Sequence, residues 1–150
     1  DSGVMQAVRQ HVFDAGNSLS NPEEMSGVFY QRGLVMSMIM AEAIANAQAE
    51  FGVAEITPAQ MRWGLENINL TAERLEELGA TGMVPPFATS CANHTGHSGG
   101  WMLQWDGEKF VQASDLLMPD LAAIQPLIDA AAADYATANA PWPVNEACEG

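Results

Sequence analysis

Residues 31–51 read QRGLVMSMIMAEAIANAQAEF, and the fold depends on this stretch. Its apolar residues surround almost the whole circumference of a helix of about 20 residues, whereas a surface helix keeps a polar face. A helix of this kind must be covered on several sides. Two interpretations stay open: its alanines let neighbouring elements approach closely, or the helix packs against polypeptide that these 150 residues do not contain.

Apolar spacing and capping residues predict four further helices, at 4–13, 58–67, 71–79 and 120–135. The second of them has the strongest start signal. Thr57 precedes Pro58, and Gln60 stands where a capping box places Glu or Gln. A polar connector at 18–27 is the best candidate for a domain crossing, with a boundary near Ser26.

The C-terminal half is less regular. Glycine and proline punctuate Gly79–Gly100, which we expect to be a long loop with at most one short strand. Two stretches, 101–105 and 109–114, alternate apolar and polar residues around Asp106 and Gly107, and this pattern predicts a β-hairpin. An extended tail is expected from Ala136 to the end.

Composition excludes several classes of protein. A content of 48% hydrophobic and 16% charged residues predicts one packed domain rather than a disordered tail. The formal net charge of −14 repels phosphate backbones, so nucleic acid is not expected as a partner. No apolar run is long enough to span a bilayer, and we expect a soluble chain. Because the sequence starts at Asp1 without a signal peptide, we expect a processed chain or a piece of a longer one.

One short motif suggests a hydrolase. Residues 96–100 fit G-x-S-x-G, the turn that exposes a nucleophilic Ser98 in α/β-hydrolases. That turn needs a strand before it and a helix after it, and the catalytic base follows the serine in sequence. Here His11, His94 and His97 all precede Ser98. A glycine-rich loop is therefore favoured, and no catalytic residue is predicted.

The two cysteines allow two interpretations. Cys91, His94 and His97 have a spacing that a zinc ion could use. Alternatively, a disulfide between Cys91 and Cys148 would close a loop of about 57 residues, worth about 4 kcal/mol in the chain-entropy model. The disulfide is favoured if the compartment is oxidising, in which case no metal is expected.

Several segments together resemble a known family. They are Tyr30–Ile44, Arg62–Glu66, Gly82–Pro86 with Cys91 and His94, and Gln104–Gly107. In this order they resemble the C-terminal portion of the substrate-binding proteins of branched-chain amino acid type ABC transporters, which are type I periplasmic binding proteins. The resemblance covers almost the whole chain.

The resemblance implies an α/β fold with two lobes joined by hinge crossings, of which this chain would be the helix-rich C-terminal part with one β-hairpin. Residues 1–27 would belong to the second lobe and 28–100 to the first, while 101–150 would form the hinge-crossing hairpin, the last helix and the tail. The missing N-terminal portion would then cover the apolar helix. A periplasmic or extracytoplasmic location is also implied, and it supports the Cys91–Cys148 disulfide.

The resemblance further implies a role in transport. The chain would belong to the substrate-binding component of an ABC importer that closes on an amino acid, an amide or an aromatic carboxylate without covalent chemistry. Phe29 and Tyr30 stand where the family places a ligand-contacting aromatic residue. Arg32 is the nearest cation, and it could bind a carboxylate or pair with an acid on the helix surface.

The expected partners are the small-molecule ligand, an ABC permease in the membrane and the remainder of the same protein. Neither an enzyme activity nor a cofactor is expected. The alternatives to this role are a ligand-sensing module on the same fold and, more remotely, a serine or zinc hydrolase.

Overall fold

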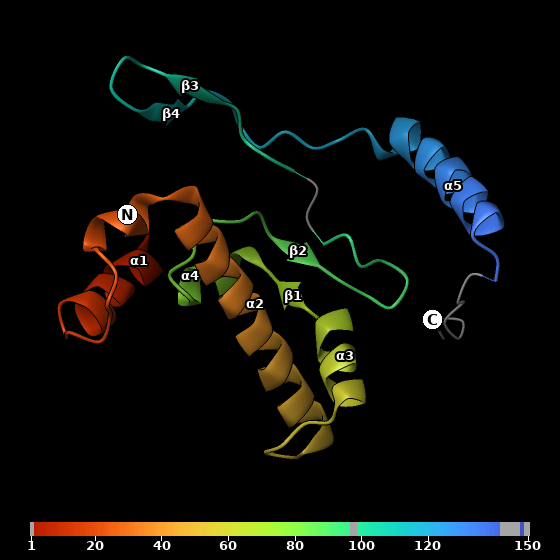
Figure 1. Cartoon of the computed structure of the whole chain (residues 1–150), viewed down its shortest axis with the longest axis horizontal. Helices are drawn as coiled ribbons and strands as arrows, with labels where there is room; N and C mark the ends of the chain where they lie inside the picture. Colours follow the sequence, from red (N-terminus) through yellow and green to blue (C-terminus); the bar gives the residue numbers. More distant parts are fainter. Residues whose placement is uncertain (1, 97–98, 142–147, 149–150) are drawn as a thin grey trace. The chain divides into compact units, whose positions relative to one another are not determined.

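The computed structural model describes residues 2–96, 99–141 and 148 (Figure 1). The chain divides into two compact units, Asp1–His97 and Ser98–Gly150. Helices alternate with short strands, and the strands form two separate two-stranded antiparallel sheets, one in each unit. The predicted mixture of helix and sheet is confirmed. The assignment of 1–27, 28–100 and 101–150 to lobes of a larger protein stays a prediction.

The longest element is α2, Val28–Phe51, and it confirms the helix predicted from Gln31. It begins directly after Gly27 and ends at Gly52, whose φ of 62° lies in the left-handed region that glycine adopts without strain. Ala43 and Ala47 are its buried residues.

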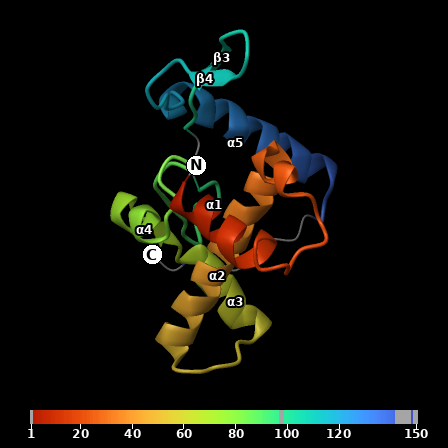
Figure 2. The same cartoon turned by 90° about the vertical axis from the view of Figure 1, so that its left-hand side faces the viewer.

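Helix α3, Pro58–Glu66, runs alongside the C-terminal part of α2 (Figure 1), and Figure 2 shows the same arrangement from the side. Its predicted capping box is present. The Thr57 hydroxyl accepts from the backbone N–H of Gln60 at 3.3 Å, and the Gln60 side chain accepts from the backbone N–H of Thr57 at 2.8 Å. Gly64 of α3 faces the backbone of Ala43, so the two helices approach closely.

Helix α4, Ala72–Glu77, also begins and ends as the sequence predicts. The Thr71 hydroxyl accepts from the backbone N–H of Arg74 at 3.1 Å, and Gly79 has a φ of 67° just beyond the helix. Arg74 then reaches α2, where its Nε and Nη2 donate to the two carboxylate oxygens of Glu42 at 3.0 and 2.6 Å. This bidentate pair ties α4 to α2.

The N-terminal helix is split. Residues Gly3–Val8 form α1, and Arg9–Phe13 continue it as a wider π-helical turn, in which the backbone N–H of Asp14 donates to the carbonyl of Arg9. A short 3-10 helix, Pro22–Ser26, lies within the predicted polar connector.

Strands β1, Asn69–Leu70, and β2, Phe87–Ala88, pair antiparallel. The sequence analysis expected one short strand in the loop and missed β1, because two residues are too few to show an alternating pattern. The core of this unit lies between this pair, α2 and α4. Its buried residues are Ala43, Ile68, Leu70, Leu75, Ala80 and Val84.

The second unit contains the predicted hairpin, with strands β3, Leu103–Trp105, and β4, Phe110–Gln112. The Asp106 carboxylate accepts from the backbone N–H groups of Glu108 and Lys109 at 2.8 and 2.9 Å, which fixes the turn. These hydrogen bonds hold the pKa of Asp106 below its usual value.

Helix α5, Leu121–Ala138, is capped by Asp120 and ends three residues later than predicted, so the first three residues of the predicted extended tail are helical. None of its residues is buried. Most of the predicted tail, 142–147 and 149–150, lies outside the described residues. Within the part of the chain that the structure covers, no helix combines the length and apolarity required to span a bilayer.

Candidate functional site

The first unit contains a cavity of about 600 Å³ between α2, α3, β2 and the loop that follows β2. Side chains of Ile39, Leu65 and Phe87 make its wall mainly apolar, and Arg62, Glu66 and His94 form a polar group in which Glu66 contacts the other two. The complete lining is Ile39, Arg62, Leu65, Glu66, Ile68, Phe87, Thr89, His94, Thr95 and Gly96.

Glu66 is the centre of the polar group. Its Oε1 accepts a hydrogen bond from Arg62 Nε at 2.8 Å and lies 3.1 Å from His94 Nε2, and its side chain is only 14% exposed. The hydrogen bond from Arg62 is the main cause that lowers the pKa of Glu66 below its usual value. Glu66 is therefore an ionised carboxylate at neutral pH, and it accepts a hydrogen bond from His94 in the tautomer that carries its hydrogen on Nε2.

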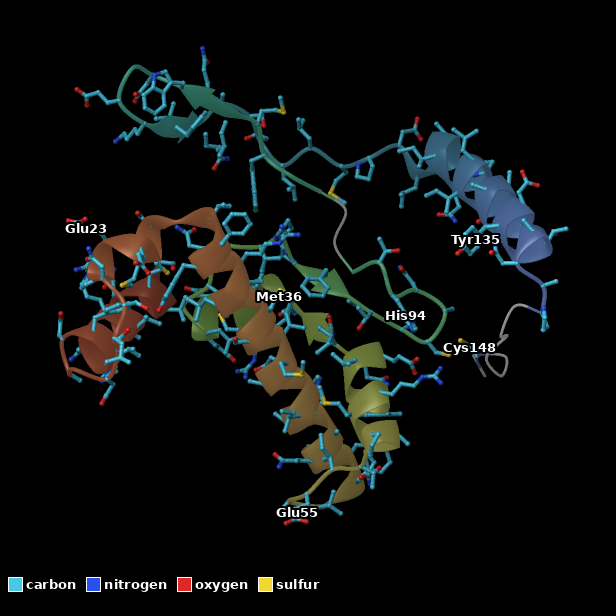
Figure 3. All side chains as sticks on the ribbon, in the orientation of Figure 1. Glu23, Met36, Glu55, His94, Tyr135 and Cys148 are labelled. Carbon is cyan, nitrogen blue, oxygen red and sulfur yellow. The ribbon has the colours of Figure 1, made fainter. Side chains whose placement is uncertain are left out.

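Local geometry places these residues together. Arg62 and Glu66 are four positions apart on α3, so they share one face of the helix. Thr89 fastens the loop to the end of α3, because its hydroxyl donates to the carbonyl of Leu65 at 2.6 Å and accepts from the backbone N–H of Ile68 at 3.2 Å. His94 lies on that loop (Figure 3).

A tight turn presents His94 to Glu66. The backbones of Ser90 and Asn93 bond to each other in both directions, at 3.0 and 3.1 Å. The Asn93 side chain then accepts from the backbone N–H of Thr95 at 3.0 Å. These bonds lie on both sides of His94 in the sequence and hold its position in the loop.

The arrangement can hold a molecule by contact and charge. In the described residues, the only hydrogen bond from the Arg62 guanidinium to the protein leaves from Nε, so its two terminal nitrogens stay available as donors. The hydroxyl of Thr89 is fully engaged with backbone groups and is unsuited to act as a nucleophile.

The sequence analysis missed Arg62 and Glu66 as site residues, and it considered His94 as a zinc ligand and as a hydrolase base but not as a partner of Glu66. The i, i+4 spacing of Arg62 and Glu66 was visible in the sequence. Nothing in the sequence, however, indicated that a residue 28 positions after Glu66 would meet its carboxylate.

The three predicted ligand residues lie elsewhere, at the start of α2. Phe29 is 82% exposed, and Tyr30 packs its ring against Phe13 with centroids 6.1 Å apart. Arg32 lines a different cavity, of about 370 Å³, together with Val28 and Val35. The three side chains are neighbours on one helix, and their ligand-binding role stays a prediction.

The disulfide alternative for the cysteines agrees with the structure. Cys91 and Cys148 are both disulfide-bonded, and no described cysteine is free. Cys91 therefore supplies no thiolate to a zinc ion, and the described residues contain no cluster of His, Cys, Asp or Glu that could hold a metal. His97 and Ser98, on which the zinc and serine hydrolase alternatives also depended, lie outside the described residues.

The chain is similar to a solved structure described as an ABC transporter permease from the Pseudomonas fluorescens group. The TM-score is 0.86 and the sequence identity is 32%. The match covers 98% of this chain and 36% of that chain, so this chain spans little more than a third of the neighbour's length. No protein-family profile and no curated protein matches the sequence.

This similarity corrects the identification made from the sequence. The resemblance to a type I periplasmic substrate-binding protein was wrong, and so was the function of binding a small molecule for an importer, because the protein that shares this fold is described as a permease. The alternative of a ligand-sensing module was derived from the same resemblance, and the same finding overturns it. The segments that suggested the family specify helices, caps and a turn, and such features define a fold rather than a role.

Proposed function

We propose that this chain belongs to a component of an ABC transporter and serves transport. The observation that carries the proposal is the match to the solved permease structure over 98% of the chain, with a TM-score of 0.86 and 32% identity. Its partners would be the remainder of the same protein and the other subunits of the transporter. The two-lobed arrangement expected from the sequence stays a prediction, because these residues correspond to only 36% of the neighbour.

The part described here is proposed to act outside the cytoplasm and without catalysis. The disulfide of Cys91 and Cys148 supports this location, because disulfides persist in oxidising compartments and are rare in the cytosol. The engaged hydroxyl of Thr89 supports a role that involves no covalent step.

Deletion of the gene tests the transport role. The deletion strain is compared with the wild type for growth and for uptake of a panel of radiolabelled amino acids, sugars, peptides and organic acids. We expect loss of uptake of at least one compound, restored by the intact gene and not by a gene that lacks the codons for 28–96. Unchanged uptake across the panel, together with no effect of the protein on ATP hydrolysis by the reconstituted transporter, would contradict the proposal.

The location is tested separately. Cells are treated with a thiol-alkylating reagent before lysis, and the peptides that contain Cys91 and Cys148 are examined by mass spectrometry. A disulfide-linked peptide pair is expected, whereas two alkylated thiols would contradict an extracytoplasmic location.

A further inference from the structure

The first unit contains a further cavity, of about 560 Å³, whose lining residues come from α2, α3, β1 and α4 and include Trp63. We call it the Trp63 cavity. It shares no lining residue with the cavity beside His94. Its volume lies within the range of about 300–1,000 Å³ that is typical of small-molecule sites. Apart from the tryptophan and one alanine, its lining consists of amide and charged side chains, so it calls for a different kind of ligand from the mainly apolar cavity described above.

One wall of the Trp63 cavity is a polar stripe on α2. Glu42, Asn46 and Glu50 follow one another at intervals of four residues, so their side chains lie on one side of the helix. Both carboxylate oxygens of Glu42 accept from Arg74, and the two charges compensate each other. Within the part of the chain that the structure describes, the carboxylate of Glu50 has no ion-pair partner. The lining therefore carries one net negative charge, from Glu50.

The asparagines of the cavity are held in position with part of their hydrogen-bonding capacity left over. Asn46 Nδ2 donates to the carbonyl of Asn67 at 3.1 Å, and Asn67 Nδ2 donates to the carbonyl of Trp63 at 2.8 Å. Each amide thus keeps its Oδ1 as an acceptor and its second N–H as a donor. The side chain of Asn69 is exposed and makes no hydrogen bond to any described residue. The cavity therefore offers a ligand both donors and acceptors.

Trp63 supplies the apolar surface of the cavity. It is half-buried, and its ring packs against Phe51 with the centroids 5.4 Å apart and the planes at 75°. This edge-to-face contact restricts the orientation of the indole. An aromatic ring that is fixed in this way gives a large contact area to the C–H groups of a ligand at little cost in side-chain entropy.

These groups together select one class of ligand. An ammonium group only donates and cannot accept from the amide N–H groups, and an anion is repelled by Glu50 and by the net charge of −14. A hydrocarbon would leave the amides without partners. A hydroxyl group both donates and accepts. A ring that carries several hydroxyl groups and a face of C–H bonds satisfies the amides and the indole at the same time.

We propose that the Trp63 cavity binds the pyranose ring of a neutral sugar, which contacts the indole and forms hydrogen bonds with the three asparagine side chains. The proposal goes beyond the transport role and does not depend on it, because the bound sugar need not be the transported compound. Its test measures binding and not uptake, so either proposal can fail while the other stands.

Calorimetric titration of the complete gene product tests the proposal. The probes are the methyl pyranosides of glucose, galactose, mannose and N-acetylglucosamine, of which we expect at least one to bind. Trp63→Leu should weaken this binding by at least about tenfold, because a tryptophan contact is lost. Trp105→Leu is the matched control and should bind as the wild type does. Trp105 also packs edge-to-face against a phenylalanine, Phe110, but it belongs to the second unit.

A second variant separates binding from folding. Asn69→Ala removes an exposed side chain that makes no hydrogen bond to the described residues, so the melting temperature of the free protein should not change. Loss of its hydrogen bonds to the sugar should weaken binding by about threefold to tenfold. Thermal unfolding of each variant without sugar checks that the fold is intact.

Each outcome of the titrations decides for or against the proposal. Binding that is weakened by Trp63→Leu and by Asn69→Ala but not by Trp105→Leu supports it. If an oligosaccharide then binds more tightly than the matching methyl pyranoside, the source of the ring is a longer glycan rather than a free sugar. The proposal is overturned if no sugar binds at millimolar concentrations, or if both cavity variants bind as tightly as the wild type. Binding of choline or ethanolamine without binding of any sugar would assign the cavity to a cation and would also overturn it.

Discussion

The contact between α2 and α3 depends on the absence of a side chain at Gly64. A Cβ built at this position would lie 2.9 Å from the carbonyl carbon of Ala43 and closer still to its oxygen, and 3.3 Å from the Cβ of Ala47. Ordinary contacts of a Cβ begin near 3.4 Å. Gly64→Ala therefore forces the backbones of the two helices apart by at least about half an ångström.

Two effects of opposite sign decide the outcome. Alanine in place of glycine inside a helix stabilises the folded state by about 1 kcal/mol. Overpacking against a backbone that cannot rotate away costs about 3 kcal/mol. We therefore expect Gly64→Ala to lower the free energy of unfolding by about 2 kcal/mol, which lowers the melting temperature of a 150-residue chain by about 4–8 °C.

Gly33→Ala is the matched control, because Gly33 also lies inside a helix and a Cβ there would meet nothing within 4 Å. In the 150-residue chain it should raise the melting temperature, since only the gain in helix propensity applies. Thermal unfolding followed by circular dichroism compares the two variants. A melting temperature for Gly64→Ala equal to or above that of the wild type would refute the close approach of α2 and α3.

Three further predictions concern the polar contacts and the disulfide. The folded-state pKa of Glu66 is lowered, so the contribution of Glu66 to stability is complete above about pH 4.5 and is lost as the pH falls through the folded pKa. The difference in melting temperature between the wild type and Glu66→Gln should therefore shrink as the pH falls through this range. A difference in melting temperature that does not change with pH would contradict this prediction. Arg74→Lys should lower the melting temperature more than Arg62→Lys, because Arg74 joins two helices through a bidentate pair with Glu42, whereas Arg62 pairs within one helix. Equal decreases in melting temperature would argue against a stabilising link between α4 and α2. Reduction of the Cys91 disulfide should destabilise the chain by about 4 kcal/mol, measured by urea unfolding with and without a phosphine reductant, and coincident unfolding curves would count against it.

The elements that the sequence predicted well have local causes. The capping box at Thr57 and Gln60 and the turn at Asp106 and Gly107 act over a few residues, so their effect can be read without knowledge of the fold. Strand β1 was missed because a strand of two residues is defined by its pairing with Phe87 and Ala88, distant in sequence, and not by its own pattern.

The candidate site could not be predicted in the same way, because it depends on contacts between residues that are distant in sequence. His94 meets Glu66 only because Thr89 fastens the intervening loop to the end of α3. Sequence spacing gives the Arg62–Glu66 pair, which lies on one helix, but not the third member of the group. The disulfide also joins distant residues, and it was anticipated because a chain with two cysteines permits only one pairing.

Helix α2 carries large apolar side chains on two sides: Val35, Met38 and Ile39 pack against the core, whereas Met36 and Met40 are exposed. At the buried contact with α3 the helix presents Ala43 and Ala47, whereas the larger Met36 and Met40 lie exposed. Alanines at the inner contact follow from the close approach of Gly64. No such reason applies to large apolar residues turned toward water, which lose the free energy of burial.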